Sequence, residues 1–241
     1  DAHYYLGHIA YQMDDYINAE SEFSQLDNKF SSKNDLDYFQ VDMNFKLGRF
    51  QQAIDLGNKL LKKSNKLYES DLSKIVGESH FNLKKYKESL PFLVAYKGIK
   101  DKWTNEDFYQ LGYAYYSEKK YDSAIDQFNK IINQSNSLSQ NAFYHLGDCY
   151  LKEEKKIEAL SAFKKASEMN FNKKIKEDAL LQYAKLGFEI GNPFESYTNV
   201  LIRFLNNYPK NKYSEKIKSL LVLSYTNGGD YDSAIKILKS A

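Results

Sequence analysis

Two short stretches of this 241-residue chain carry residue types that could do chemistry. The loop from Asn227 to Asp230 is glycine-rich, but it lacks the lysine and the Ser/Thr that a phosphate-binding loop needs. His145, Asp148 and Cys149 lie one helical turn apart, a spacing that could gather metal ligands. No His-Glu-x-x-His pair and no Gly-x-Ser-x-Gly segment occurs. We therefore predict no catalytic residue, no metal site and no cofactor: the protein is not expected to be an enzyme.

Charge and hydropathy exclude further classes of function. Thirty-four basic and 32 acidic residues leave a net charge of +2, which is too balanced for a dedicated nucleic-acid binder. Arginine, the residue suited to bidentate phosphate contacts, occurs only at Arg49 and Arg203. The best apolar runs, 90–96 and 220–225, are far shorter than a membrane span. One cysteine excludes an internal disulfide.

The elements that must position any site recur along the chain every 34 to 38 residues. One column holds mostly glycine, and a second column twelve residues later holds small residues. The glycine column reads Gly7, Val41, Gly77, Gly112, Gly147, Ala184 and Val222. The small column reads Ala19, Ala53, Ser89, Ala124, Ala159, Ser196 and Ala234. Cys149 belongs to a third column, two residues after the glycine column, and this favours a packing role for it over metal binding. Apolar residues around both columns follow helical spacing, so each unit is predicted to be two helices joined by a polar turn.

This pattern resembles the tetratricopeptide repeat family, whose unit is a helix-turn-helix of about 34 residues. The resemblance covers essentially the whole chain and implies an all-α, right-handed α-solenoid of about seven antiparallel helix pairs. We expect one domain over 1–241, with repeats at about 1–33, 34–69, 70–103, 104–138, 139–175, 176–212 and 213–241. Thr104 to Asp107 is an example of a helix-capping signal. The abrupt ends, without polar capping helices, suggest a fragment of a longer protein.

Some positions depart from the repeat. Gln40, Val41 and Gly57 stand where leucine, glycine and a large apolar residue are expected. Lys156 and Pro193 occupy the aromatic column of their units. Because proline fixes its backbone angle and lacks an amide donor, we expect a looser bend near Asn192 and Pro193.

By the same resemblance, the first helix of each unit lines a concave groove, with contact residues three before, one after and four after the glycine column. These positions are Tyr4, His8, Tyr11, Tyr38, Asp42, Phe45, Lys74, Glu78, Phe81, Tyr109, Tyr113, Tyr116, Tyr144, Asp148 and Leu151. A further column, six residues before the glycine column, adds Asp1, Asp35, Asp71, Glu106 and Asn141. The aromatics favour side-chain contacts, and the excess of acids favours a neutral to basic segment. The alternative is that the acids are helix N-terminal residues and the aromatics pack between repeats. The carboxylate clamp of the family's chaperone-docking members is missing.

We therefore expect a noncatalytic scaffold that binds a protein segment in this groove within a larger assembly. Two alternatives stay open: a sensor or regulatory region of a longer multidomain protein, and a structural spacer that self-associates through its open ends. The stretch from Phe204 to Pro209 is similar to the Tyr-Pro ends of longer repeats in bacterial outer-membrane assembly lipoproteins. This resemblance suggests a location in the periplasm or cell envelope, with the cytoplasm as the alternative.

Overall fold

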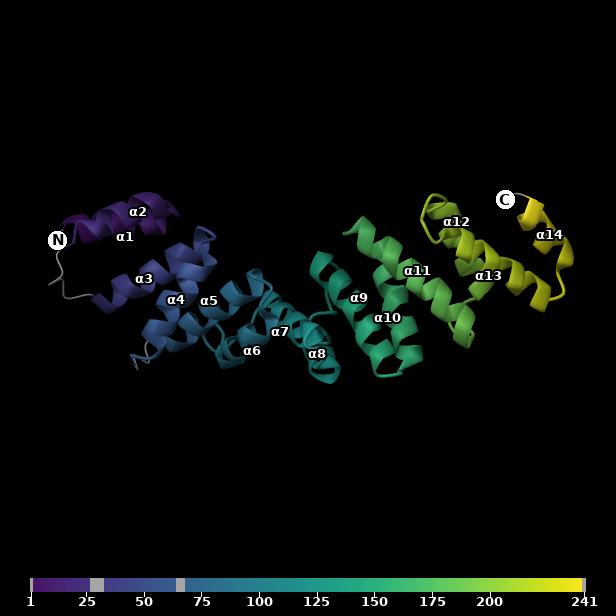
Figure 1. The fold of residues 1–241 in the computed structure, drawn as a ribbon, viewed down its shortest axis with the longest axis horizontal. Coiled ribbons are helices and arrows are strands. Elements are labelled where there is room, and N and C mark those ends of the chain that lie inside the picture. Colours follow the sequence, from purple (N-terminus) through teal and green to yellow (C-terminus); the bar gives the residue numbers. More distant parts are fainter. Residues whose placement is uncertain (1, 27–32, 64–67, 240–241) are drawn as a thin grey trace. The chain divides into compact units, whose positions relative to one another are not determined.

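The computed structural model describes residues 2–26, 33–63 and 68–239, and it divides into two compact units (Figure 1). The first unit, Asp1–Glu118, holds α1 (Ala2–Gln12), α2 (Tyr16–Ser24), α3 (Lys33–Lys46), α4 (Phe50–Leu61), α5 (Glu69–Asn82), α6 (Tyr86–Ala95) and α7 (Asn105–Ser117). The second unit, Lys119–Ala241, holds α8 (Tyr121–Phe128), α9 (Ser137–Lys152), α10 (Lys156–Glu168), α11 (Lys173–Ile190), α12 (Tyr197–Asn207), α13 (Ser214–Asn227) and α14 (Tyr231–Lys239). Within the described ranges there are no strands beyond a single isolated bridge, between Ile99 and Lys102.

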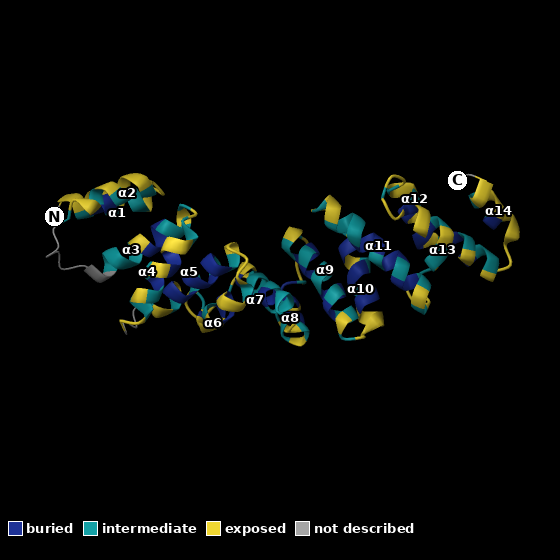
Figure 2. Ribbon diagram, in the orientation of Figure 1, coloured by how far each residue is buried: buried dark blue, intermediate teal, exposed yellow. Residues whose placement is uncertain are grey.

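The helices of each unit pack in chain order, as a helical repeat requires. In the first unit each helix contacts the next, and α5 also contacts α3 and α7. In the second unit α11 likewise contacts α9 and α13. Figure 2 shows buried residues along the faces where successive helices meet. The predicted all-α architecture of helix-turn-helix repeats is therefore confirmed; the right-handed twist and the single domain stay predictions.

The glycine column allows the two helices of a repeat to approach closely. A Cβ built on Gly147 would lie 2.6 Å from Cε1 of Phe163, a fully buried ring on the following helix. A Cβ on Gly7 would lie equally close to the ring of Phe23. Only a residue without a side chain fits these positions, which explains why the column is mostly glycine.

The second repeat reverses this arrangement. Val41 takes the glycine position on α3, and Gly57 takes the position that Phe23 and Phe163 occupy on their helices. Both residues are buried, and a Cβ on Gly57 would meet Cγ1 of Val41 at 3.5 Å and Cγ2 of Val76 at 2.4 Å. The two departures noted in the sequence thus compensate each other, because a large residue faces a small one in either order.

The turn between the two helices of each repeat contains a residue in the left-handed region, always seven positions after the glycine column. These residues are Asp14, Gly48, Lys84, Lys119, Glu154, Gly191 and Gly229, with φ between 58° and 78°. Four of the seven carry side chains and so hold a conformation that favours glycine. The loop from Gly191 to Ser196, after α11, is longer than the other hairpin turns, which confirms the looser bend expected around Pro193.

A buried glutamine holds the connection between α10 and α11 in the second unit. The Gln140 side chain is fully buried, and its Nε2 donates to the carbonyls of Ala166 at 3.0 Å and Met169 at 2.9 Å. Its Oε1 accepts from the backbone amides of Phe171 at 3.1 Å and Asn172 at 2.7 Å. Because both ends of the amide are used, this one side chain fixes where α10 ends and where α11 begins.

Candidate functional site

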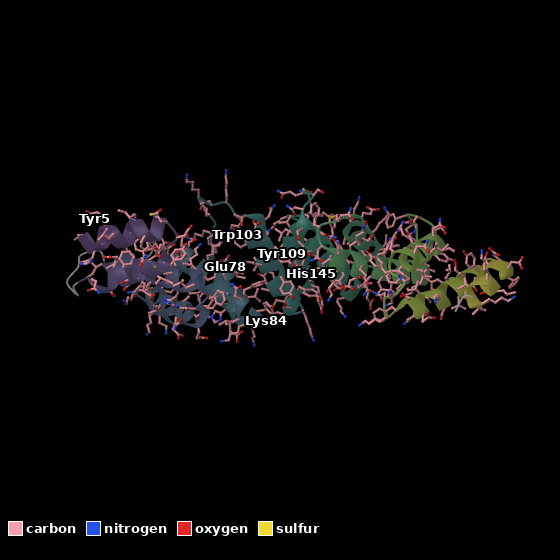
Figure 3. All side chains as sticks on the ribbon, turned by 90° about the horizontal axis from the view of Figure 1, so that it is seen from above. Tyr5, Glu78, Lys84, Trp103, Tyr109 and His145 are labelled. Atoms are coloured by element: carbon pink, nitrogen blue, oxygen red, sulfur yellow. The ribbon has the colours of Figure 1, made fainter. Side chains whose placement is uncertain are left out.

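The predicted contact residues divide between the two units. Twelve of them lie on α1, α3, α5 and α7, the first helices of the first unit's repeats. Together with Asp35, Asp71 and Glu106 of the further column, they form what we call the first-helix face. Tyr144, Asp148 and Leu151 lie on α9 of the second unit and form a separate group. Figure 3 labels Glu78 on α5 and Tyr109 on α7. Asp1 lies outside the described residues.

Tyr11 and Asp42 connect the first two repeats. The Tyr11 hydroxyl donates to Oδ2 of Asp42 at 2.6 Å, and the Asp42 residue is buried. The Tyr11 ring lies 4.7 Å from Phe39, and the His8 ring meets Phe39 edge-on at 5.7 Å. Burial, and then the hydrogen bond to Asp42, raise the pKa of Tyr11. The hydroxyl therefore stays a neutral donor at physiological pH.

A second tyrosine-aspartate pair follows on the next repeat. The Tyr68 hydroxyl donates to Oδ1 of Asp35 at 2.6 Å, and the Tyr68 ring stacks on Tyr38 at a centroid distance of 4.5 Å. The hydrogen bond to Asp35 is the main reason that the pKa of Tyr68 rises to about 12. Burial raises the pKa of Tyr38, assisted by the charges of Asp42 and Asp71. Sequence reasoning missed Tyr68, because it lies in the connection before α5 and outside the repeat columns.

Lys74 is engaged within the protein. Its Nζ lies 2.7 Å from Oδ1 of Asp107 and 3.9 Å from Oε1 of Glu78, and it sits over the Tyr96 ring at 4.8 Å. Asp107 also closes the capping box of α7 with Thr104, which confirms the expected capping signal. Burial raises the pKa of Glu78. The single lysine of the face thus compensates mainly Asp107, a residue outside the predicted set.

Aromatic rings gather where α5, α6 and α7 meet. The Tyr113 ring contacts Phe81 at 5.8 Å and Tyr86 at 5.4 Å, both edge-on, and lies 6.2 Å from Tyr109. Tyr116 is 5.9 Å from Tyr113. Burial raises the pKa of Tyr109 to about 12. Of the four tyrosines that the sequence assigned to one cluster, Tyr109, Tyr113 and Tyr116 on α7 are therefore in ring contact, and Tyr86 on α6 joins them, whereas Tyr144 lies on α9 in the second unit.

The remaining predicted residues are placed as follows. Tyr4 contacts Phe23 and stacks on His8, and Phe45 contacts Phe50. Asp71 and Glu106 are exposed at the starts of their helices.

On α9 the predicted residues take part in packing within the second unit. The Tyr144 ring meets Phe163 edge-on at 5.8 Å, and Leu151 packs against the same core. Burial raises the pKa of Tyr144 to about 12, and raises the pKa of the fully buried Cys149 thiol to about 12 as well. In the part of the chain that the structure describes, no group of three or more His, Cys, Asp or Glu side chains could hold a metal ion.

The first-helix face keeps its negative charge even though its acids have partners. The hydroxyls that donate to Asp35 and Asp42 are neutral, so they hold the two carboxylates in place without cancelling their charges. Asp42 is buried, and the lower dielectric around it strengthens the field of its carboxylate. The face can therefore attract a cation and offer it ordered acceptors.

The second unit contains a cleft that the sequence did not indicate. It has a volume of about 590 Å³ and lies between the α8–α9 and α10–α11 connections. Its lining residues include Ile132, Phe143, Lys165, Met169 and Phe171. One wall is the segment held by Gln140, so the cleft has a rigid side.

No helix among residues 2–26, 33–63 and 68–239 is long and apolar enough to cross a membrane.

Comparisons with known proteins agree with this architecture. Residues 94–166 match the family model described as anaphase-promoting complex, cyclosome, subunit 3. YrrB, a TPR protein with an unusual peptide-binding site, is similar in structure with a TM-score of 0.59 and 17% identity, over 76% of this chain and 89% of YrrB. PilF of Pseudomonas aeruginosa gives a TM-score of 0.55 and 16% identity, over 91% of this chain and 96% of PilF. A tetratricopeptide repeat protein of Parabacteroides merdae gives a TM-score of 0.54 and 16% identity, over 86% of this chain and 77% of that protein. The search of curated proteins found no match.

The fold defines the class of this protein: a helical-repeat solenoid, a type of scaffold that generally serves protein-protein interaction. The matched repeat model over residues 94–166 and these structural relatives make the chain similar in fold to tetratricopeptide repeat proteins.

Proposed function

We propose that this chain is a noncatalytic scaffold that binds a neutral to basic protein segment along the first-helix face of its first unit. One observation carries the proposal: tyrosine hydroxyls hold the Asp35 and Asp42 carboxylates in place, and among the side chains that the structure describes no lysine or arginine pairs with either one. A lysine or arginine of a bound segment can pair directly with the partly exposed Asp35, whereas the buried Asp42 attracts it through its charge.

The aromatic side chains supply the second part of recognition. Tyr38, Tyr109 and Tyr113 are partly buried rings that offer large contact areas with few rotatable bonds. Their contacts with neighbouring rings hold them in place before a partner arrives, which lowers the entropy cost of binding. YrrB, with its peptide-binding site, lends support through its fold alone.

The experiment is a selection of short random peptides, displayed on phage, with the whole chain as bait. The informative variant is Asp35→Asn combined with Asp42→Asn, because the amide oxygen still accepts the hydrogen bonds of Tyr68 and Tyr11. The matched control is Asp55→Asn combined with Glu88→Gln, which removes the same charge from exposed positions on the second helices α4 and α6.

The expected result is a set of peptides with one or more Lys or Arg beside apolar residues, retained by the control and lost by the Asp35/Asp42 variant. The proposal fails if the selected peptides are acidic, or if the variant enriches the same peptides as the wild type.

The proposal includes a place in a larger assembly and in the bacterial cell envelope, which is supported by the short Tyr-Pro segment ending at Pro209. Cell fractionation with an antibody against the native protein tests this part. Recovery in the cytosolic fraction would refute it.

A further inference from the structure

The cleft of about 590 Å³ in the second unit is lined by two aromatic rings, Phe143 on α9 and Phe171 just before α11. Phe171 is 51% exposed, although its backbone amide is held by the buried Gln140 at 3.1 Å. Across the described ranges, neither ring contacts another aromatic ring. Both rings are therefore available to a ligand, and Phe171 is presented by a segment that is already ordered.

The preceding repeat shows what a phenylalanine at this position contacts. The column four residues before the glycine column holds Phe108 on α7 and Phe143 on α9. The connection before α7 places the Trp103 ring 5.2 Å from Phe108, at an interplanar angle of 32°. The connection before α9 supplies Gln134 and Ser135 to the cleft and no aromatic side chain. A ligand that brings its own ring can make with Phe143 the contact that Trp103 makes with Phe108.

The charges at the cleft favour an anion. Two charged side chains of α10, Lys165 and Glu168, belong to its lining. Glu168 already has a partner, because its carboxylate lies 2.5 Å from Nζ of Lys164. Lys165 is exposed and forms no ion pair with any side chain that the structure describes. The lining therefore offers one cation whose charge a ligand can compensate.

The two amide side chains of the lining also favour a ligand that accepts hydrogen bonds. Oδ1 of Asn170 accepts from Nζ of Lys176 at 2.5 Å, and Oε1 of Gln134 accepts from Nδ2 of Asn136 at 2.8 Å. Both orientations are fixed by their partners: a lysine can only donate, and Oδ1 of Asn136 is used by the Ser139 amide at 2.9 Å. With their oxygens engaged, both amides keep their NH₂ groups for a ligand.

We propose that this cleft binds a small aromatic carboxylate, with its ring between Phe143 and Phe171. The carboxylate pairs with Lys165, and the NH₂ groups of Gln134 and Asn170 are the further donors that line the cleft. The volume of about 590 Å³ lies in the range of small-molecule sites. The cleft shares no residue with the first-helix face, so this proposal can stand if peptide binding there fails, and the reverse.

The experiment is a titration of the isotope-labelled whole chain, followed by the backbone amide signals in two-dimensional NMR. The first probe is indole-3-acetate, because its ring is the one that Trp103 places on Phe108. Indole-3-acetamide keeps the ring and removes the charge, and hexanoate keeps the carboxylate and removes the ring. The informative variant is Lys165→Gln, and the matched control is Lys152→Gln, which removes an exposed lysine of α9 outside the cleft.

Indole-3-acetate is expected to shift the amide signals of Phe171 and Asn172. Lys165→Gln should weaken its binding about fivefold, the upper end for an ion pair of an exposed lysine, and Lys152→Gln should leave it within about twofold. Indole-3-acetamide should bind the wild type and Lys165→Gln equally, and more weakly than the acetate binds the wild type. Hexanoate should bind more weakly than indole-3-acetate, because it lacks the contact with the two rings.

A second pair of variants tests the aromatic wall. Phe171→Ala should weaken both indole probes, whereas Phe194→Ala, which removes another exposed ring of the same unit, should weaken neither. Unchanged far-ultraviolet circular dichroism confirms that each variant keeps its helices.

Three results would overturn the proposal. The first is the absence of shifts at Phe171 and Asn172 up to about 10 mM indole-3-acetate, an affinity too weak for a site. The second is equal binding of indole-3-acetate to the Lys165 and Lys152 variants, or equal binding of the acetate and the acetamide to the wild type, which would exclude recognition of the carboxylate. The third is equal binding of hexanoate and indole-3-acetate, or equal effects of Phe171→Ala and Phe194→Ala, which would exclude recognition of the ring.

Discussion

Replacing Gln140 by leucine removes the buried side chain that fixes the α10–α11 connection. The leucine fills most of the volume but leaves the amides of Phe171 and Asn172 and the carbonyls of Ala166 and Met169 without their partner. A buried backbone group without a hydrogen bond costs about 1 to 3 kcal/mol. Two backbone amides lose their hydrogen bonds, and burial of the apolar leucine side chain offsets part of this cost. We therefore predict a loss of about 3 kcal/mol in the free energy of unfolding.

Gln140→Glu is the informative companion to this variant. Its carboxylate still accepts from Phe171 and Asn172 but faces the carbonyl oxygens of Ala166 and Met169, so its folded-state pKa must lie above the ordinary value of about 4.3. A raised pKa means that stability is present below the unfolded pKa and is lost as pH rises towards the folded one. The Gln140→Glu variant should therefore gain stability relative to wild type on acidification from neutral pH.

The assay is chemical denaturation followed by far-ultraviolet circular dichroism at several pH values, with amide hydrogen exchange at Phe171 and Asn172. Gln140→Leu should lower the denaturation midpoint and expose both amides to faster exchange. A loss below about 1 kcal/mol for Gln140→Leu, or a pH dependence of Gln140→Glu that matches wild type, would refute the reasoning.

Three further predictions concern packing, turns and titration. Gly147→Ala should cost at least about 2 kcal/mol in denaturation measurements because its Cβ would overlap the buried Phe163 ring. Gly228→Ala should change stability little because its Cβ would meet no atom closer than 3.4 Å, and equal effects of the two substitutions would contradict the role given to close packing. Lys84→Gly should raise stability by about 0.5 kcal/mol because Lys84 holds φ 59°, which strains a residue with a side chain. Lys85→Gly, at φ −91°, should lower stability, and the reverse order of the two effects would show that the backbone at Lys84 is not strained. Burial lowers the pKa of His145 to about 4, so the neutral form stabilises the fold above pH 6.5 and this stability is lost as pH falls towards 4. His145→Gln should remove that part of the acid sensitivity in thermal melts across this range, and an unchanged pH profile would exclude His145 as its source.

The repeat columns explain why so much of the fold could be predicted. The glycine and small-residue columns mark where two helices approach, and the structure places Gly7 and Gly147 against buried rings as close packing demands. The exchange of Val41 and Gly57 could be noticed as a departure, but its compensation depends on residues that face each other across two helices. The left-handed turn residues fall at one column, yet Lys84 and Glu154 are not residue types that mark such a conformation.

The sequence predicted most residues of the candidate site, but it did not predict the hydrogen bonds and the ion pair that join them. The repeat columns identified Tyr11 and Asp42 separately. The hydrogen bond between them could not be predicted, because it depends on how α1 lies against α3. Tyr68 lies outside the columns, so nothing in the pattern linked it to Asp35. Lys74 was expected to face a partner, but its distance to Asp107 depends on how α5 and α7 meet.

Binding of a basic segment beside Asp35 and Asp42 is tested most directly by titrating a fluorescent peptide from the phage selection into the purified chain and following anisotropy. We expect Asp35→Asn with Asp42→Asn to weaken binding about tenfold, equivalent to about 1.4 kcal/mol, and Asp55→Asn with Glu88→Gln to leave it within about twofold. Added salt should weaken wild-type binding more than binding to the Asp35/Asp42 variant. Equal losses in the two double variants, or no loss in either, would contradict it.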